Sequence, residues 1–168
     1  MRRLLFLASI LVMGPTLTVL FAVGAYAAEP LAKNGTGTLH SGFRGVGTTT
    51  PTADKRLYWM GSFWGVSFND EGKGLFHHAV WNCPAISDIY DNTIHTKGSC
   101  AVTDTDGDRI LGDWTGKGPV GGEFAGEVTI SGGTGKYAGM QGNWDFHCLG
   151  VGTDDQLYCR QKYTYKLP

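Results

Sequence analysis

The sequence predicts an all-β protein, namely an eight-stranded antiparallel β-barrel held by two disulfides. The chain contains 26 glycines spread through it without low-complexity repeats, and 12% of its residues are aromatic. Apolar and polar residues alternate over short runs that end in polar turns, while leucine-rich helical periodicity is almost missing. Such a pattern is typical of many short strands joined by tight turns. Eight consecutive strands close into a barrel whose interior holds side chains or one small ligand.

The first 27 residues predict a secretory signal peptide. Arg2 and Arg3 precede the apolar run 4–23, and Ala25 and Ala27 form an A-x-A cleavage signal. Cleavage after Ala27 leaves residues 28–168 as one barrel domain, secreted or periplasmic in a bacterium and with no membrane attachment. The alternative is an uncleaved membrane anchor, because about twenty apolar residues can span a bilayer; Pro15 interrupts the run and favours the signal peptide.

Charge excludes one class of partner. The chain carries 14 Lys and Arg against 15 Asp and Glu. No basic patch stands out, which argues against a nucleic-acid partner.

The four cysteines predict two disulfides in an oxidising compartment, because an even number follows a signal peptide. Three connectivities are possible. We favour Cys83–Cys100 and Cys148–Cys159, since each closes a single strand-turn-strand unit. No pair has C-x-x-C spacing, so we expect no metal site and no cofactor.

Alternation and turn residues place the strands. We expect strands at 36–44, 56–68, 74–83, 95–103, 108–114, 123–130, 142–149 and 156–166, and loops at 45–53, 84–92 and 115–122. The strand 56–68 is apolar on both faces, so we expect both faces to be covered. The cover is either another subunit, in a homotrimer or homodimer, or a loop or terminal segment.

The last hairpin provides a test of one disulfide. In both of its strands the apolar parity contains the cysteine, and cross-strand partners must point to the same side of a sheet. This agreement supports Cys148–Cys159 and places the apolar residues of the same parity inside the barrel. They are Trp144, Phe146, Tyr163 and Tyr165. Asp145 and His147 then lie outside.

A family resemblance rests on the glycine-rich stretch 131–142, SGGTGKYAGMQG. It resembles the GTG-(K/R)-(Y/F)-x-G-x-x-G corner of the allene oxide cyclase/dirigent barrel superfamily. The upstream GSC at 98–100, DTDGD at 104–108 and Trp114 are similar to small secreted bacterial members without assigned activity. The resemblance covers about 98–144 and implies an eight-stranded barrel, often trimeric. The superfamily includes cyclases of fatty-acid epoxides and proteins that guide phenoxy-radical coupling, but their active-site residues match no position here.

The alternating aspartates Asp104, Asp106 and Asp108 allow two interpretations. Carboxylate oxygens are calcium ligands, but the spacing lacks the glycine and closing glutamate of an EF-hand loop. We favour a hairpin turn, marked by Asp106-Gly107, in which carboxylates accept hydrogen bonds from backbone amides.

The histidines and tyrosines supply candidate chemistry. His77 shares a strand parity with Trp81 and Cys83, so we expect it inside the barrel, as an acid/base group or as a hydrogen-bonded core histidine. Tyr163 or Tyr165 would assist it in catalysis. No inward pair of carboxylates and no known hydrolase or phosphate-binding motif occurs.

The inward aromatic residues give the main functional prediction. Trp81, Trp114, Trp144 and Phe146 would line an apolar pocket for a small apolar or aromatic molecule, unless the core is fully packed. Three hypotheses follow. The protein binds such a ligand, or acts on it as a cyclase, isomerase or lyase with His77 and a tyrosine, or is a structural oligomeric barrel with a filled lumen.

Overall fold

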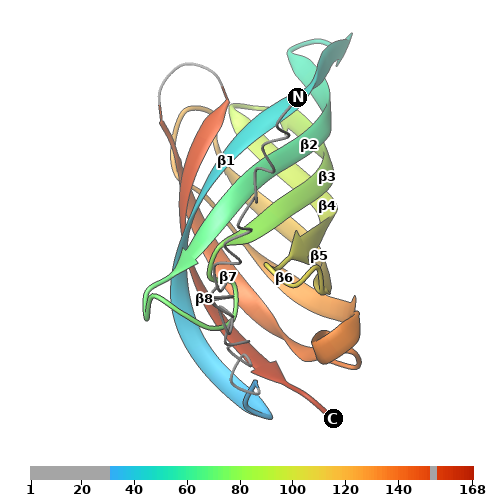
Figure 1. The fold of residues 1–168 in the computed structure, drawn as a ribbon. Coiled ribbons are helices and arrows are strands. Elements are labelled where there is room, and N and C mark those ends of the chain that lie inside the picture. Colours follow the sequence, from blue (N-terminus) through green and yellow to red (C-terminus); the bar gives the residue numbers. More distant parts are fainter. Residues whose placement is uncertain (1–30, 152–154) are drawn as a thin grey trace, which may run out of the picture.

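A computed structural model describes residues 31–151 and 155–168, which form one closed β-barrel (Figure 1). Each strand pairs antiparallel with the next, and β8 closes the barrel on β1. The only helix among these residues is the 3₁₀ turn η1, Gly135–Tyr137. The strands are β1 Asn34–Ala53, β2 Arg56–Asn69, β3 Ala79–Tyr90, β4 Thr93–Thr103, β5 Arg109–Pro119, β6 Phe124–Gly133, β7 Gln141–Gly150 and β8 Gln156–Lys166.

The eight-stranded prediction is confirmed, but most residues of the three predicted loops belong to strands, and only 91–92 and 120–122 of them form turns. Residues 45–53 extend β1, which pairs with β2 as far as Ala53↔Arg56, and 115–119 extend β5. Residues 84–90 continue β3. Pro84 lies between two pairs of the β3–β4 ladder, Asn82↔Ala101 and Ala85↔Gly98. Glycine, threonine and proline suggest loops locally, whereas pairing with neighbouring strands keeps these segments extended; 45–53 pairs with β2 alone, because the β1–β8 pairing ends at Arg44.

The predicted strand 74–83 is wrong in its first half. Residues 70–78 form the loop between β2 and β3, and β3 begins only at Ala79. Leu75 and Phe76 are buried in the barrel rather than placed on a strand. Phe76, which the predicted parity puts outside, is 3% exposed, and half-buried His77 lies beside it in the loop.

The two ends of the barrel differ. The turns β1–β2, β3–β4 and β5–β6 lie at one end, together with the end of β7 and the start of β8. It is called here the mouth end, and the β1–β2 hairpin projects there beyond the other strands (Figure 1). The β2–β3 loop, the β4–β5 turn, η1 and the C-terminus lie at the other, called the corner end. Figure 1 shows η1 and the C-terminus together there.

Both predicted disulfides are present. Cys148 and Cys159 are direct cross-strand partners with Cα atoms 4.0 Å apart, and Cys83–Cys100 joins β3 to β4 with Cα atoms 4.1 Å apart. Both disulfides point into the lumen, where all four cysteines are buried. They therefore cross-link two separate parts of the barrel wall.

Strand alternation separates an aromatic interior from a mixed exterior. All six aromatic residues predicted to be inward are buried, while Asp145 and His147 are exposed as predicted. The outward face of β2 stays uncovered by the described residues. It belongs to a group of exposed apolar side chains on β1–β3, namely Val46, Met60, Trp64, Val66, Phe68, Val80 and Ile86.

The predicted signal peptide and its cleavage site lie outside the described residues. Within them, no helix has the length and hydrophobicity needed to cross a membrane.

Candidate functional site

A cavity of about 60 Å³ lies in the lumen toward the mouth end. Its wall contains both disulfides and a continuous set of aromatic rings. Four of its side chains, from β1, β2, β6 and β8, are only half-buried and form the rim: Phe43, Phe63, Phe124 and Leu157. The deeper lining residues include Trp81, Trp114, Val128, Trp144, Phe146 and Gln161.

Trp114 on β5 is the centre of this aromatic wall. Its ring makes edge contacts with Phe63, Phe124 and Phe146, at centroid distances of 6.0, 6.5 and 5.9 Å. The indole lies over Gly98 of β4, where an added Cβ would be 2.9 Å from Nε1. A Cβ there would also lie 2.2 Å from the Pro84 carbonyl oxygen, so glycine at this inward position leaves room for both the neighbouring β3 backbone and the indole.

The Nε1–H group of Trp114 has no acceptor among the described residues. The side chain is 7% exposed, so water does not readily replace the missing partner. Buried polar groups are nearly always hydrogen-bonded, and each exception calls for an explanation. The neighbouring indole of Trp81 differs, since its Nε1 donates to Ser67 Oγ at 2.8 Å.

Besides the Trp114 indole N–H, the polar group of note in the cavity wall is an amide. Gln161 of β8 donates from Nε2 to Ser41 Oγ at 2.6 Å, and both side chains are buried. The cavity-lining residues include no aspartate, glutamate, histidine, lysine, arginine or tyrosine, and their cysteines are all in disulfides. The described wall can therefore contact an apolar molecule, its unpaired donor is the buried Nε1–H of Trp114, and it offers no acid/base group.

The candidate catalytic residues lie apart from this cavity, toward the corner end. Tyr163 OH receives a hydrogen bond from Asn69 Nδ2 at 2.8 Å; burial raises the pKa of Tyr163, and the Asn69 bond partly opposes the rise. Burial also raises the pKa of Tyr165. His77 lies in the β2–β3 loop with its ring against those of Phe68 and His78. None of these three lines the cavity, and their catalytic roles stay predictions.

The sequence predicted the inward position of four of the aromatic residues that line the cavity. Trp81, Trp114, Trp144 and Phe146 line the cavity, as their parity predicted. The rim residues and Gln161 were missed. Alternation along β2 pointed to Phe63, but both faces of that strand are apolar, so its inward face was ambiguous.

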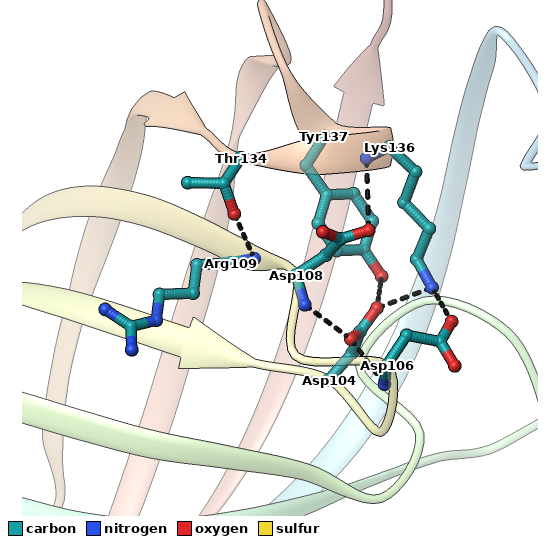
Figure 2. Close-up of polar contacts among 7 residues, drawn as sticks. All are labelled: Asp104, Asp106, Asp108, Arg109, Thr134, Lys136 and Tyr137. Carbon is teal, nitrogen blue, oxygen red and sulfur yellow. Dashed lines mark hydrogen bonds and ion pairs between the residues drawn. The ribbon is translucent and has the colours of Figure 1, made fainter.

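The aspartate cluster is a hairpin turn, as favoured from sequence (Figure 2). Asp104 Oδ1 accepts hydrogen bonds from the backbone N–H groups of Asp106 and Asp108, at 2.8 and 3.0 Å. Its other oxygen accepts a bond of 2.8 Å from Tyr137 OH, and Lys136 Nζ lies 2.6 Å from it. A lysine ammonium thus occupies the space beside the carboxylates, and the described residues contain no group suited to a metal.

This turn is joined to the glycine-rich corner. Asp108 Oδ2 accepts from the Lys136 N–H at 3.1 Å, and Thr134 Oγ1 accepts from the Arg109 N–H at 2.9 Å (Figure 2). Gly135 has φ +52°, and a Cβ there would be 1.8 Å from Asp108 Oδ1. The GTGKY sequence is therefore a structural connection at the corner end.

The pKa values of the cluster agree with this connection. Burial alone would raise the pKa of Asp104, but hydrogen bonds from Lys136, Tyr137 and the Asp106 N–H lower it overall. Burial would lower the pKa of Lys136, and the two carboxylates raise it overall. Burial and the Asp104 carboxylate together raise the pKa of Tyr137.

Comparison with known proteins places the fold. No family model matches the sequence, and neither does any curated protein. Among solved structures, a pterocarpan synthase dirigent protein superposes with a TM-score of 0.53 over 89% of this chain and 99% of that chain, at 11% identity. The chain has the dirigent-like barrel fold. At this identity the likeness concerns the fold, so the chemistry of the dirigent-like barrel must come from its own residues.

Proposed function

We propose that this dirigent-like barrel is a secreted binding protein for a small apolar or aromatic molecule that carries a hydrogen-bond acceptor. The supporting observation is the unpaired Nε1–H of Trp114 in an otherwise apolar, aromatic cavity wall. A carbonyl or ether oxygen on the ligand would satisfy this donor, and the surrounding rings would contact the apolar part.

The size of the cavity restricts how a ligand enters. Ligand pockets of drug-sized molecules usually measure about 300–1,000 Å³, whereas this cavity has about 60 Å³. A ring-containing ligand therefore requires the half-buried rim side chains to turn outward. Phe43 and Leu157 are direct neighbours on β1 and β8, so they can move together at one side of the mouth.

The enzymatic alternative has less support. A cyclase, isomerase or lyase needs a group that moves a proton near neutral pH. The described cavity wall has none, and His77 lies in the loop at the other end of the barrel.

Secretion is part of the proposal. Two disulfides form and persist in oxidising compartments. The predicted signal peptide and the dirigent-like fold point the same way.

Two measurements test ligand binding. Native mass spectrometry of the protein from its own host should reveal a retained small molecule. In titration calorimetry, Trp114→Phe should weaken benzaldehyde binding by about 3- to 10-fold, as expected for one lost hydrogen bond, and leave toluene binding unchanged. An equal effect on both compounds would remove Trp114 as the donor. Absence of saturable binding to the wild-type protein would favour the filled structural barrel.

We also propose self-association through the exposed apolar side chains of β1–β3. Trp64 is 51% exposed and Met60 62% exposed, on outward positions of β2 on either side of Ser62, and a partner surface of the same apolar character would cover them. Light scattering should find a dimer or trimer that Trp64→Lys dissociates, whereas Asp145→Lys on β7 should not. A monomeric wild-type protein would refute this proposal.

A further inference from the structure

The β2–β3 loop, residues 70–78, closes the corner end of the lumen with its own side chains. Leu75 and Phe76 are buried, and the Phe76 ring lies among three inward aromatic rings. Its centroid is 5.6 Å from that of Trp81, 5.4 Å from Trp144 and 5.1 Å from Tyr163. The first contact is stacked, and the other two are edge contacts. Such an enclosure is suited to a single aromatic ring.

Trp81 and Trp144 are shared between this enclosure and the mouth-end cavity. Both indoles line the cavity, and both contact the Phe76 ring. The Phe76 ring therefore contacts the same two indoles that a ligand in the cavity would contact. If the ring left, the lumen would gain a ring-sized space adjoining the existing cavity.

Side chains of β2 hold the loop in place through hydrogen bonds to its backbone. Asn69 Nδ2 donates to the Leu75 carbonyl at 2.8 Å, and Ser67 Oγ donates to the Phe76 carbonyl at 2.6 Å. These contacts engage the loop's backbone carbonyls, which become free to bind water when the loop moves out. The strand side chains keep other partners, since Asn69 also donates to Tyr163 OH.

The closed loop is strained. Phe76 has φ +64° and His78 has φ +55°, in the left-handed region that non-glycine residues rarely adopt. The Nδ1 atom of His77, between them, is buried and has no partner among the described residues. Outward movement of the loop would relieve both the strained backbone and the unpaired nitrogen.

The loop also contains its own hinge. Gly72 and Gly74 have φ +71° and +83°, and an added Cβ at either position would have no heavy atom within 4 Å. These glycines lie in open space before the buried pair of side chains. The loop can therefore change its backbone angles there without disturbing the core.

We propose that Phe76 is an internal occupant of an aromatic-ring site, and that the loop 70–78 swings outward to admit a ligand's aromatic ring in its place. The inference rests on the proposed function, because it extends the ligand-binding lumen to the corner end. It assigns the site a ligand class, namely a molecule with an unsubstituted or small-substituted phenyl ring, which matches the ring it replaces.

Toluene is the suitable probe, because it is the side chain of phenylalanine without its backbone. The full-length mature protein and its Phe76→Ala variant are titrated with toluene by calorimetry. The variant should bind at least about tenfold more tightly than wild type, because its ring site is permanently vacant while wild type must first open the loop. Leu149→Ala, at an exposed position on the outer face of β7, is the matched control and should bind as wild type does.

Hydrogen exchange tests the loop movement in the wild-type protein. Saturating toluene should accelerate amide exchange in residues 70–78 and leave the rate unchanged in the β4–β5 turn. Toluene binding without faster exchange in the loop, or no binding to wild type at all, would overturn the displacement. If Phe76→Ala does not fold, Phe76→Leu with its smaller side chain is titrated in its place.

The outcomes separate this inference from the proposed function. Equal toluene affinity of the wild-type protein and Phe76→Ala, with a loop that stays protected, overturns the ring site and leaves the mouth-end cavity as the binding site. If Phe76→Ala binds toluene and the wild-type protein does not, a ring-sized site exists but the loop 70–78 does not open in the native protein, which overturns the displacement. The proposed ligand binding by the wild-type lumen then loses its support as well.

Discussion

Substitution of Asp104 by alanine should destabilise the barrel far more than the same substitution two residues later. Asp104 is in contact with four donors at once: two backbone N–H groups, Tyr137 OH and Lys136 Nζ. Asp106 contacts Lys136 Nζ through a carboxylate that is 56% exposed. The two variants therefore remove the same chemical group from very different surroundings.

The expected magnitude follows from these contacts. A net hydrogen bond to a charged group contributes about 1.5–3 kcal/mol, and such contributions are not additive within one network. The ion pair with the partly exposed Lys136 adds about 1 kcal/mol. Asp104→Ala also leaves the buried Tyr137 hydroxyl without its acceptor. We expect a loss of about 3–4 kcal/mol for Asp104→Ala and below about 1 kcal/mol for Asp106→Ala.

Urea unfolding followed by tryptophan fluorescence, with the disulfides intact, measures both losses. The comparison requires equal m values, so that the midpoint shift reports the free energy of unfolding. Similar losses for the two variants, or a loss below about 1 kcal/mol for Asp104→Ala, would refute the structural role of the corner network.

Three further predictions concern stability. Because the folded state lowers the pKa of Asp104, this group stabilises the fold above about pH 4, and its contribution is lost as the pH falls through the lowered pKa. Because the folded state raises the pKa values of Lys136 and Tyr137, their contribution is complete below about pH 10 and is lost above it. Urea unfolding measured across this pH range would detect both losses of stability. The double serine variant of Cys148–Cys159 should lose about 3 kcal/mol, as expected for closure of a loop of this length, and an unchanged urea midpoint would contradict this. Gly135→Ala should lower the melting temperature measured by circular dichroism, because its Cβ would collide with Asp108; an unchanged value would refute the close packing of the corner.

The choice of inward residues shows where sequence reasoning worked. On β7 and β8 the side-chain period of two, combined with a cysteine in each strand, fixed both the disulfide and the buried aromatic residues. This worked because the register of a hairpin depends on near neighbours in sequence. It failed for residues 74–78, where alternation continued although the chain had left the sheet.

His77 and Phe76 show the physical reason for that failure. A strand with regular alternation puts His77 inside and Phe76 outside, whereas in the structure Phe76 is buried and His77 is half-buried beside it in the loop. This arrangement depends on positive φ at Phe76 and on bonds from Ser67 and Asn69 to the loop's carbonyls. Residue types alone do not reveal a left-handed phenylalanine, because the conformation is imposed by partners elsewhere in the barrel.

By itself the sequence determined the all-β class, the number of strands, the two disulfides and the aromatic character of the interior, because these follow from local alternation, turn residues and paired cysteines. Only the tertiary structure decided how full the lumen is and which donor remains unpaired. The small cavity, the unpartnered indole of Trp114 and the occupation of the corner end by Phe76 result from closing eight strands around large side chains. The space left between rings depends on the contacts of all strands together, and no segment of the sequence carries that information alone.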